Sequence, residues 1–167
     1  MVVALLFGAF VSAACGPAAR VDEPVTSATV EGIVDGDTVD VRIDGRRERV
    51  RLLGIDTPES VARHVPQQCF GSEASQALAE LLPIGSEVEI QRDIEARDRY
   101  GRLLLYLHRP QDGLFINLWL VESGFAEAVS YEPNVVHQLD FVAAQRRAET
   151  SGNGLWASCD GPDQPLD

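Results

Sequence analysis

The chain has 167 residues, of which 45% are hydrophobic, and this length accommodates one folded domain with a sizeable core. Its 26 acidic and 14 basic residues give a formal net charge of −12, and every basic residue is arginine. The composition excludes a disordered chain, and no apolar run reaches the about 20 residues that a polytopic membrane protein would need for each span. Because nucleic-acid binding normally needs a basic face, such a function would require a local cluster of cations in this acidic chain.

Residues 1–15 have the pattern of a secretory signal peptide. Val2 to Ala14 is an uncharged run of apolar and small residues, and it ends at Cys15. Small residues directly before a cysteine resemble a bacterial lipobox, in which the cysteine is lipidated. We therefore expect either a lipidated Cys15 or an ordinary cleaved signal peptide. A buried N-terminal helix is the third alternative. Residues 16–26 are then a flexible tether. The protein is therefore expected to be exported, as a cell-surface lipoprotein anchored to the membrane or as a secreted protein.

The remaining chain alternates between strand and helix patterns. Five segments have the alternation and flanking turn residues of β-strands: 27–34, 38–43, 48–55, 87–92 and 103–108. Three segments have helical patterns: 72–82 with Ser72 as its N-cap, 116–123, and 134–150 with Asn134 as its N-cap. This order favours an α+β, mostly β fold: a five-stranded OB-type Greek-key barrel with about three packed helices. The predicted domain spans residues 27–159, and residues 160–167 form a C-terminal tail.

The cysteines agree with export. If Cys15 is lipidated or removed, Cys69 and Cys159 remain, and an even number in an exported protein indicates a disulfide. Such a bond would close a loop of about 90 residues. Two free thiols or two metal ligands are the alternatives, although two distant cysteines without clustered histidines make a poor zinc site.

Two aspartates are candidates for a metal site. Asp37 and Asp56 each lie at the end of a predicted strand, and a meander brings such ends close together. Neighbouring carboxylates repel one another unless a cation lies between them. Together with a backbone carbonyl such as that of Thr57, they form an all-oxygen set that suits Ca²⁺ or Mg²⁺ better than Zn²⁺.

Arg51, Glu59 and Arg102 extend this set toward phosphoryl transfer. Arg51 precedes Asp56 by five residues on one predicted strand, so a bulge or curl at Gly54 is needed to bring the two side chains to one site. A divalent metal, two arginines and a free carboxylate are the groups that promote phosphoryl transfer to water. Each segment alone also has an ordinary structural explanation, as a turn or as a solvated surface cation.

Three motifs together resemble the staphylococcal nuclease family: DGDT at 35–38, RLLGIDTPE at 51–59 and DRYGR at 98–102. They occur in the family's order, and the similarity extends from about residue 26 to residue 156. The resemblance implies an OB-fold barrel with Ca²⁺-dependent phosphodiesterase activity on DNA and RNA. The chain departs from the family at Val129, which stands where a further pocket tyrosine is expected.

The resemblance also implies a role for individual residues. It assigns metal binding to Asp37, Asp56 and the carbonyl of Thr57, and catalysis to Arg51, Glu59 and Arg102. It assigns substrate binding to Arg99, Tyr100 and Tyr131. The expected partner is a DNA or RNA substrate, the expected cofactor is Ca²⁺, and the expected state is a monomer. The alternatives are an OB-type module that holds nucleic acid or a protein partner without cutting it, and a lipid-anchored structural protein of the cell envelope.

Overall fold

The computed structural model describes residues 26–60 and 66–166. The predicted signal segment, Cys15 and nearly all of the predicted tether fall in residues 1–25 and therefore lie outside the described residues. No helix in the described part of the chain combines the length and the apolar character that a membrane crossing requires.

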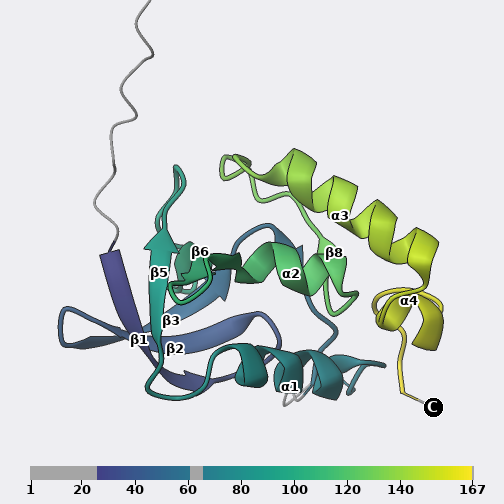
Figure 1. Ribbon diagram of the computed structural model, residues 1–167, viewed down its shortest axis with the longest axis horizontal. Coiled ribbons are helices and arrows are strands. Elements are labelled where there is room, and N and C mark those ends of the chain that lie inside the picture. Colours follow the sequence, from purple (N-terminus) through teal and green to yellow (C-terminus); the bar gives the residue numbers. More distant parts are fainter. Residues whose placement is uncertain (1–25, 61–65, 167) are drawn as a thin grey trace, which may run out of the picture.

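Five strands form a closed barrel (Figure 1): β1 (Thr26–Ile33), β2 (Thr38–Ile43), β3 (Arg46–Leu52), β5 (Glu87–Gln91) and β6 (Leu103–Arg109). The first three strands form an antiparallel meander, β5 pairs with β1, and β6 pairs with β5. A parallel pairing of β3 with β6, in which Arg51 is opposite Leu104, closes the barrel. This arrangement confirms the predicted OB-type barrel.

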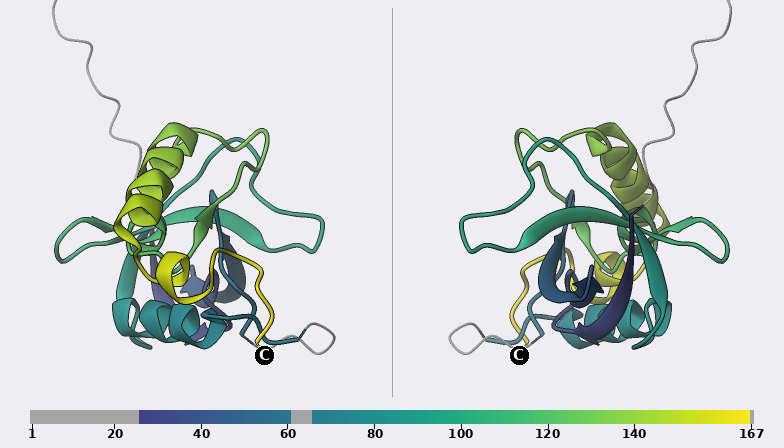
Figure 2. Two further views of the ribbon diagram at one scale, coloured as in Figure 1. Left: turned by 90° about the vertical axis from the view of Figure 1, so that its right-hand side faces the viewer. Right: turned by 90° about the vertical axis from the view of Figure 1, so that its left-hand side faces the viewer.

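Helices lie mainly on one side of the barrel: α1 (Gly71–Leu81), α2 (Ile116–Glu122), α3 (Gln138–Ser151) and a short α4 (Leu155–Ser158). In Figure 1, α2 lies between α1 and α3, and Figure 2 shows α3 and α4 on the side of the molecule away from β1. Three two-residue strands complete the fold: β4 (Ile55–Asp56), which pairs with β8 (Glu127–Ala128), and β7 (Leu114–Phe115), which pairs with β6. The sequence patterns missed α4, β7 and β8 because each is only two to four residues long.

The barrel interior is filled by alternate residues of its strands. Val39 and Val41 of β2, Val50 and Leu52 of β3, and Leu105 of β6 are fully buried. The period-two alternation of a strand directs these side chains to one face, and closure of the barrel removes that face from water. Each buried valine or leucine contributes about 1.5–3 kcal/mol to the free energy of folding.

The predicted third strand over 48–55 is wrong at its C-terminal end. The strand stops at Leu52, and a turn with Gly54 at φ +78° redirects the chain into the separate strand β4. Only glycine fits there, because a Cβ on Gly54 would collide with the ring of Phe141. The turn therefore changes the direction of the chain five residues before Glu59.

Both predicted helix caps differ from the structure. α1 begins at Gly71 with Phe70 in the N-cap position, so Ser72 lies inside the helix. α3 begins at Gln138 instead of 134, with His137 at the N-cap position. Asn134 is used for a tertiary contact: its Oδ1 accepts the N–H of Glu95 at 2.7 Å, and its Nδ2 donates to the Glu95 carbonyl at 3.1 Å. A side chain that can cap a helix can equally bind a distant backbone.

Cys69 and Cys159 form the predicted disulfide. The residues that follow Cys159, which the sequence analysis assigns to a C-terminal tail, run back along the segment before α1. The N–H of Cys69 donates to the Gln164 carbonyl at 2.8 Å, and Gln68 forms an antiparallel bridge with Pro165. The end of the described chain is thus attached to the segment that follows Glu59.

Candidate active site

Arg51 is the centre of the candidate site. Its side chain is only 5% exposed, and its Nη2 lies 3.0 Å from Asp37 Oδ2 and 2.5 Å from Asp56 Oδ1. The same nitrogen donates a hydrogen bond to the hydroxyl of Tyr131 at 2.9 Å. Nη1 donates to two main-chain carbonyls around the turn after β3, at 2.7 and 2.8 Å. The guanidinium therefore joins the turn before β2, strands β3 and β4, and the segment before α3 at one point.

The turn at Gly54 is what brings Arg51 and Asp56 together. Residues five apart on one regular strand face opposite sides of the sheet. Because the strand breaks after Leu52, the side chain of Asp56 points to the same side as that of Arg51, and the two form a hydrogen bond. The curl that the sequence analysis required at Gly54 is therefore present, as a turn between two strands.

The carboxylate of Asp37 is fixed by the two segments beside it. Oδ1 accepts the hydroxyl of Thr38 at 2.9 Å, and Oδ2 accepts the backbone N–H of Thr57 at 3.2 Å. The two segments approach closely because residue 36 is glycine: a Cβ there would lie 2.7 Å from Thr57 Oγ1. The turn before β2 and the segment after β4 thus form one unit around Asp37.

Negative charge exceeds positive charge in this unit. Burial raises the pKa of Asp37, and the nearby Asp56 raises it further, although Arg51 opposes both effects. Burial also raises the pKa of Asp56, again against the effect of Arg51. Burial and the charge of Asp37 raise the pKa of Asp35 to about 6. Arg51 is in direct contact with the two carboxyl groups of Asp37 and Asp56, and an additional cation would stabilise their charged forms.

The donors at this place fit a hard divalent cation. Asp37 and Asp56 offer carboxylate oxygens, and the carbonyl of Thr57 accepts no hydrogen bond from another described residue. Asp37 is buried, whereas the side chain of Asp56 is 45% exposed, so the donors can be reached from solvent. Within residues 26–60 and 66–166 there is no group of three or more His, Cys, Asp or Glu side chains that could hold a metal. Two carboxylates and a carbonyl are the types of oxygen donor that hard divalent cations prefer.

Glu59 lies three residues after Asp56, on the segment that leads to α1. Its side chain is partly buried and forms no ion pair or hydrogen bond with any described residue. Its backbone is fixed on both sides: the N–H donates to Gln68 Oε1 at 2.6 Å, and the carbonyl accepts the N–H of Gln68 at 2.9 Å. Gly71 packs directly against the Glu59 carbonyl, where a Cβ would collide.

A cleft of about 320 Å³ begins at Arg51 and contains the predicted substrate-binding residues together with Arg102, the second predicted catalytic arginine. Its lining includes Arg99, Tyr100, Arg102 and Tyr131. The guanidinium of Arg99 lies 4.7 Å from the centre of the Tyr100 ring, and that of Arg102 lies 5.6 Å from it. Tyr100 is 69% exposed, which leaves its ring available to a ligand.

The structure thus brings together most of the predicted site residues. Arg51 connects the metal-ligand candidates with the cleft, whereas Asp37, Asp56, Thr57 and Glu59 do not line the cleft itself.

Residues that support the site were missed by the sequence analysis. Asp98 accepts a hydrogen bond from Arg102 Nε at 2.6 Å and fixes that side chain. Its position at the start of the DRYGR turn, four residues before Arg102, is a signal that could have revealed this contact. The role of Gln68 has no such signal, because no local pattern predicts a contact with Glu59 nine residues earlier.

Comparison with known proteins agrees with this geometry. The family described as "Staphylococcal nuclease homologue" matches residues 49–158. The chain is 35% identical to the thermonuclease of Staphylococcus intermedius over 130 residues, which cover 78% of this chain and 76% of that protein. It is 34% identical to the thermonuclease of Staphylococcus hyicus over 126 residues, 75% of this chain and 73% of that protein. It is also 31% identical to endonuclease YncB of Bacillus subtilis over 143 residues, 84% of this chain and 66% of that protein. With this match and the barrel described above, the chain belongs to the staphylococcal nuclease family.

Proposed function

We propose that the protein is a Ca²⁺-dependent phosphodiesterase that hydrolyses DNA or RNA. One observation carries this proposal: a buried arginine, Arg51, holds two carboxylates on one side and lines a cleft of arginines and tyrosines on the other. The carboxylates suit a hard cation, while the cleft suits a phosphate flanked by a base or sugar. The names of the relatives, thermonuclease and endonuclease, point to the same substrate class.

Asp37, Asp56 and the carbonyl of Thr57 are the proposed ligands of Ca²⁺. When bound, Ca²⁺ supplies positive charge that neutralises a phosphate oxygen and favours attack by water. Arg51 and Arg102 are proposed to stabilise the charge that builds on the phosphate oxygens in the transition state. A guanidinium is suited to this role because its planar array of donors binds two oxygens at once and stays charged.

Glu59 is the proposed group that orients the attacking water or accepts its proton. Two features support this assignment: the carboxylate has no partner among the described residues, and its backbone is held by Gln68 and by contact with Gly71. A fixed backbone with a free carboxylate keeps a general base in place without neutralising it. Tyr100 and Arg99 are proposed to bind the nucleotide beside the scissile bond, and Tyr131 to border the same cleft from the opposite segment.

Hydrolysis of denatured DNA in Ca²⁺, in chelator, and in Zn²⁺ alone tests the proposal. Activity is expected only with Ca²⁺. Asp37→Ala and Asp56→Ala are expected to weaken Ca²⁺ binding measured by calorimetry, because each removes a charged ligand. Binding of DNA without hydrolysis would favour a non-cutting module, and full activity in chelator would contradict the metal assignment.

We also propose that the protein is exported and acts as a monomer, either lipid-anchored at Cys15 or secreted. The apolar run that ends at Cys15 and the Cys69–Cys159 disulfide support export, because disulfides persist in oxidising compartments. Mass spectrometry of the mature protein tests the anchor: a diacylglycerol-modified Cys15 supports it, and an unmodified N-terminus after residue 15 contradicts it.

A further inference from the structure

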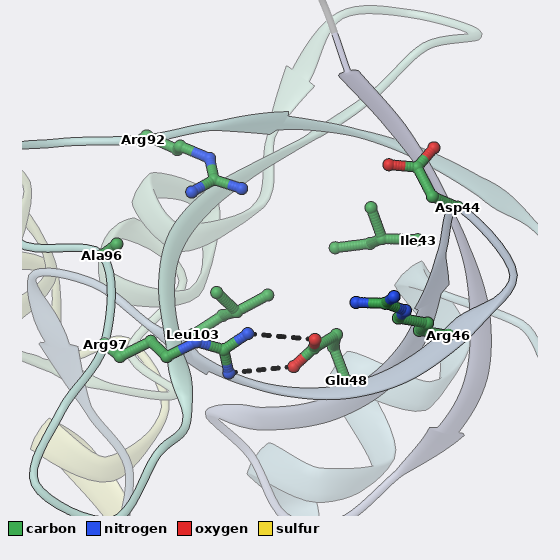
Figure 3. A pocket seen from close by; sticks show the side chains of 8 residues that line it. All are labelled: Ile43, Asp44, Arg46, Glu48, Arg92, Ala96, Arg97 and Leu103. Carbon is green, nitrogen blue, oxygen red and sulfur yellow. Dashed lines mark hydrogen bonds and ion pairs between the residues drawn. The ribbon is translucent and has the colours of Figure 1, made fainter.

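A second groove, of about 500 Å³, lies at one end of the barrel (Figure 3). It is formed where β2 ends, β3 begins, β5 ends and β6 begins, so its walls are the ends of barrel strands and their connections. Ile43 and Leu103 give it an apolar floor, and polar side chains surround them. None of the described residues that line this groove is aromatic.

Three arginines and two acidic residues line the groove, so its balance of charge is positive although the whole chain carries a charge of −12. Arg97 is already occupied, since its two terminal nitrogens donate to the carboxylate of Glu48 at 2.9 and 3.0 Å. Arg46 and Arg92 are different: neither side chain forms an ion pair or hydrogen bond with another residue that the structure describes. In Figure 3 their guanidinium groups point into the groove from opposite sides. These two cations face one space, with Asp44 as a further carboxylate at its rim, and the charge of Arg46 also acts on Glu48.

The groove and the active-site cleft share a wall. Consecutive residues of β6 line the two spaces, Leu103 the groove and Leu104 the cleft. The connection before β6 does the same, with Arg97 in the groove and Asp98 in the cleft. Successive side chains of a strand face opposite sides, so the groove and the cleft lie on opposite sides of this segment, and a polymer bound in both must cross it.

We propose that this groove binds backbone phosphates of a single-stranded nucleic acid whose scissile bond lies in the active-site cleft. Arg46 and Arg92 are the phosphate-binding residues, and Arg97 is held in place by Glu48. Arginine binds phosphate through charge and paired hydrogen bonds, and the lack of an aromatic stacking surface makes the contact independent of sequence. The inference rests on the proposed function, because it identifies the substrate as a polynucleotide that extends beyond the scissile bond.

Fluorescence anisotropy in EDTA tests the groove without hydrolysis. The probe is a labelled oligothymidylate of about 16 nucleotides, the upper site size of one OB fold. The double variant Arg46→Ala/Arg92→Ala is expected to raise Kd about five- to tenfold and to lower the slope of log K against log salt by about 1.4, since each phosphate contact on a single strand contributes about 0.7. Both side chains are exposed, so the variant is expected to keep the wild-type melting temperature.

Two matched variants distinguish the groove from a general charge effect. Arg46→Lys/Arg92→Lys keeps both charges and is expected to keep the wild-type salt slope. Arg146→Ala removes an exposed arginine of α3 that does not line the groove, and is expected to leave Kd unchanged. An unchanged Kd and slope in the double alanine variant, or an equal loss in Arg146→Ala, would overturn the proposal. If polyglutamate binds the wild type as tightly as the oligothymidylate does, and the double alanine variant loses this binding, the groove binds an acidic peptide and the nucleic-acid proposal is overturned.

Hydrolysis in Ca²⁺ separates this inference from the proposed function. In the double alanine variant, the KM for the long strand is expected to rise by the same factor as Kd, whereas hydrolysis of a dinucleotide stays at the wild-type rate. If the wild type hydrolyses nothing but the variant loses binding, the proposed function fails and the groove stands. If the wild type hydrolyses both substrates and the variant matches it on the long strand, the groove assignment fails and the proposed function stands.

Discussion

Gln68 holds the backbone of Glu59 by two hydrogen bonds. The N–H of Glu59 donates to the side-chain Oε1 of Gln68, and the N–H of Gln68 donates to the carbonyl of Glu59. Gln68 is itself held from the end of the described chain, because its Nε2 donates to Asp163 Oδ1 at 3.0 Å and the adjacent Cys69 is bonded to Cys159. The proposed general base is thus fixed by the C-terminal segment rather than by the barrel alone.

Gln68→Ala is expected to reduce kcat by about 10- to 100-fold, because a small displacement of a catalytic group has a large effect on rate. Ca²⁺ affinity should stay unchanged, since Gln68 does not contact Asp37 or Asp56. Steady-state kinetics and calorimetry on the same samples check both expectations. Gln67→Ala is the control, because that side chain donates to Ser72 and does not contact Glu59. Equal kcat in the two variants would contradict a positioning role for Gln68.

Reduction of the Cys69–Cys159 disulfide is expected to lower the free energy of unfolding by about 4 to 5 kcal/mol, because the bond spans 90 residues and restricts the unfolded chain. Urea unfolding with and without dithiothreitol measures the difference. The variant Cys69→Ser/Cys159→Ser should have the lower stability and no response to dithiothreitol. Labelling of either cysteine by a thiol reagent in denaturant without reductant would show that the mature protein lacks the bond.

Arg51→Lys is expected to lower the free energy of unfolding by about 3 kcal/mol, because lysine keeps the charge but cannot replace the planar set of donors, which leaves buried acceptors without hydrogen bonds. Arg51 binds Asp37, Asp56 and two main-chain carbonyls, so the loss extends beyond one contact. Urea unfolding is the measurement, and Arg99→Lys, at an exposed position, is the control. Wild-type stability in Arg51→Lys would contradict the central structural role of this residue.

Asp40 is expected to make stability depend on pH. A hydrogen bond from Arg49, with a smaller contribution from one by Arg47, holds the pKa of Asp40 below its usual value, although burial alone would raise it. A carboxyl with a lowered pKa in the folded protein stabilises it above about pH 4, and this contribution is lost as the pH falls through the folded-state pKa. Asp40→Asn should therefore be less stable than wild type at pH 7, by about 1 kcal/mol or less because both arginines are exposed. The difference in free energy of unfolding between wild type and Asp40→Asn should become smaller at acid pH. An equal difference at pH 7 and pH 3, measured by urea unfolding, would contradict this expectation.

The barrel and its metal-ligand candidates could be predicted because local patterns encode them. Alternation and turn residues define the strands around Asp37, and a meander brings its end toward Asp56. The need for a bend at Gly54 also followed from the five-residue spacing of Arg51 and Asp56, although the sequence did not indicate that the strand would divide into two.

Contacts between distant segments could not be predicted in this way. Asn134 has the pattern of a helix cap, yet it binds the backbone of Glu95, 39 residues away. The attachment of the C-terminal segment to Gln68 likewise depends on how the chain returns after α4, which no local periodicity encodes. The groove at the barrel end combines residues from four strand ends, so it exists only once the barrel has closed.

Glu59 is proposed to act on the transition state of phosphodiester hydrolysis. The most direct test compares wild type with Glu59→Gln, a nearly isosteric change, on denatured DNA at saturating Ca²⁺. We expect kcat to fall by roughly 10² or more, with KM little changed, because general-base catalysis contributes about 10²–10⁴ and the lost interaction is made mainly in the transition state. Hydrolysis by Glu59→Gln at the wild-type rate would contradict a catalytic role for Glu59.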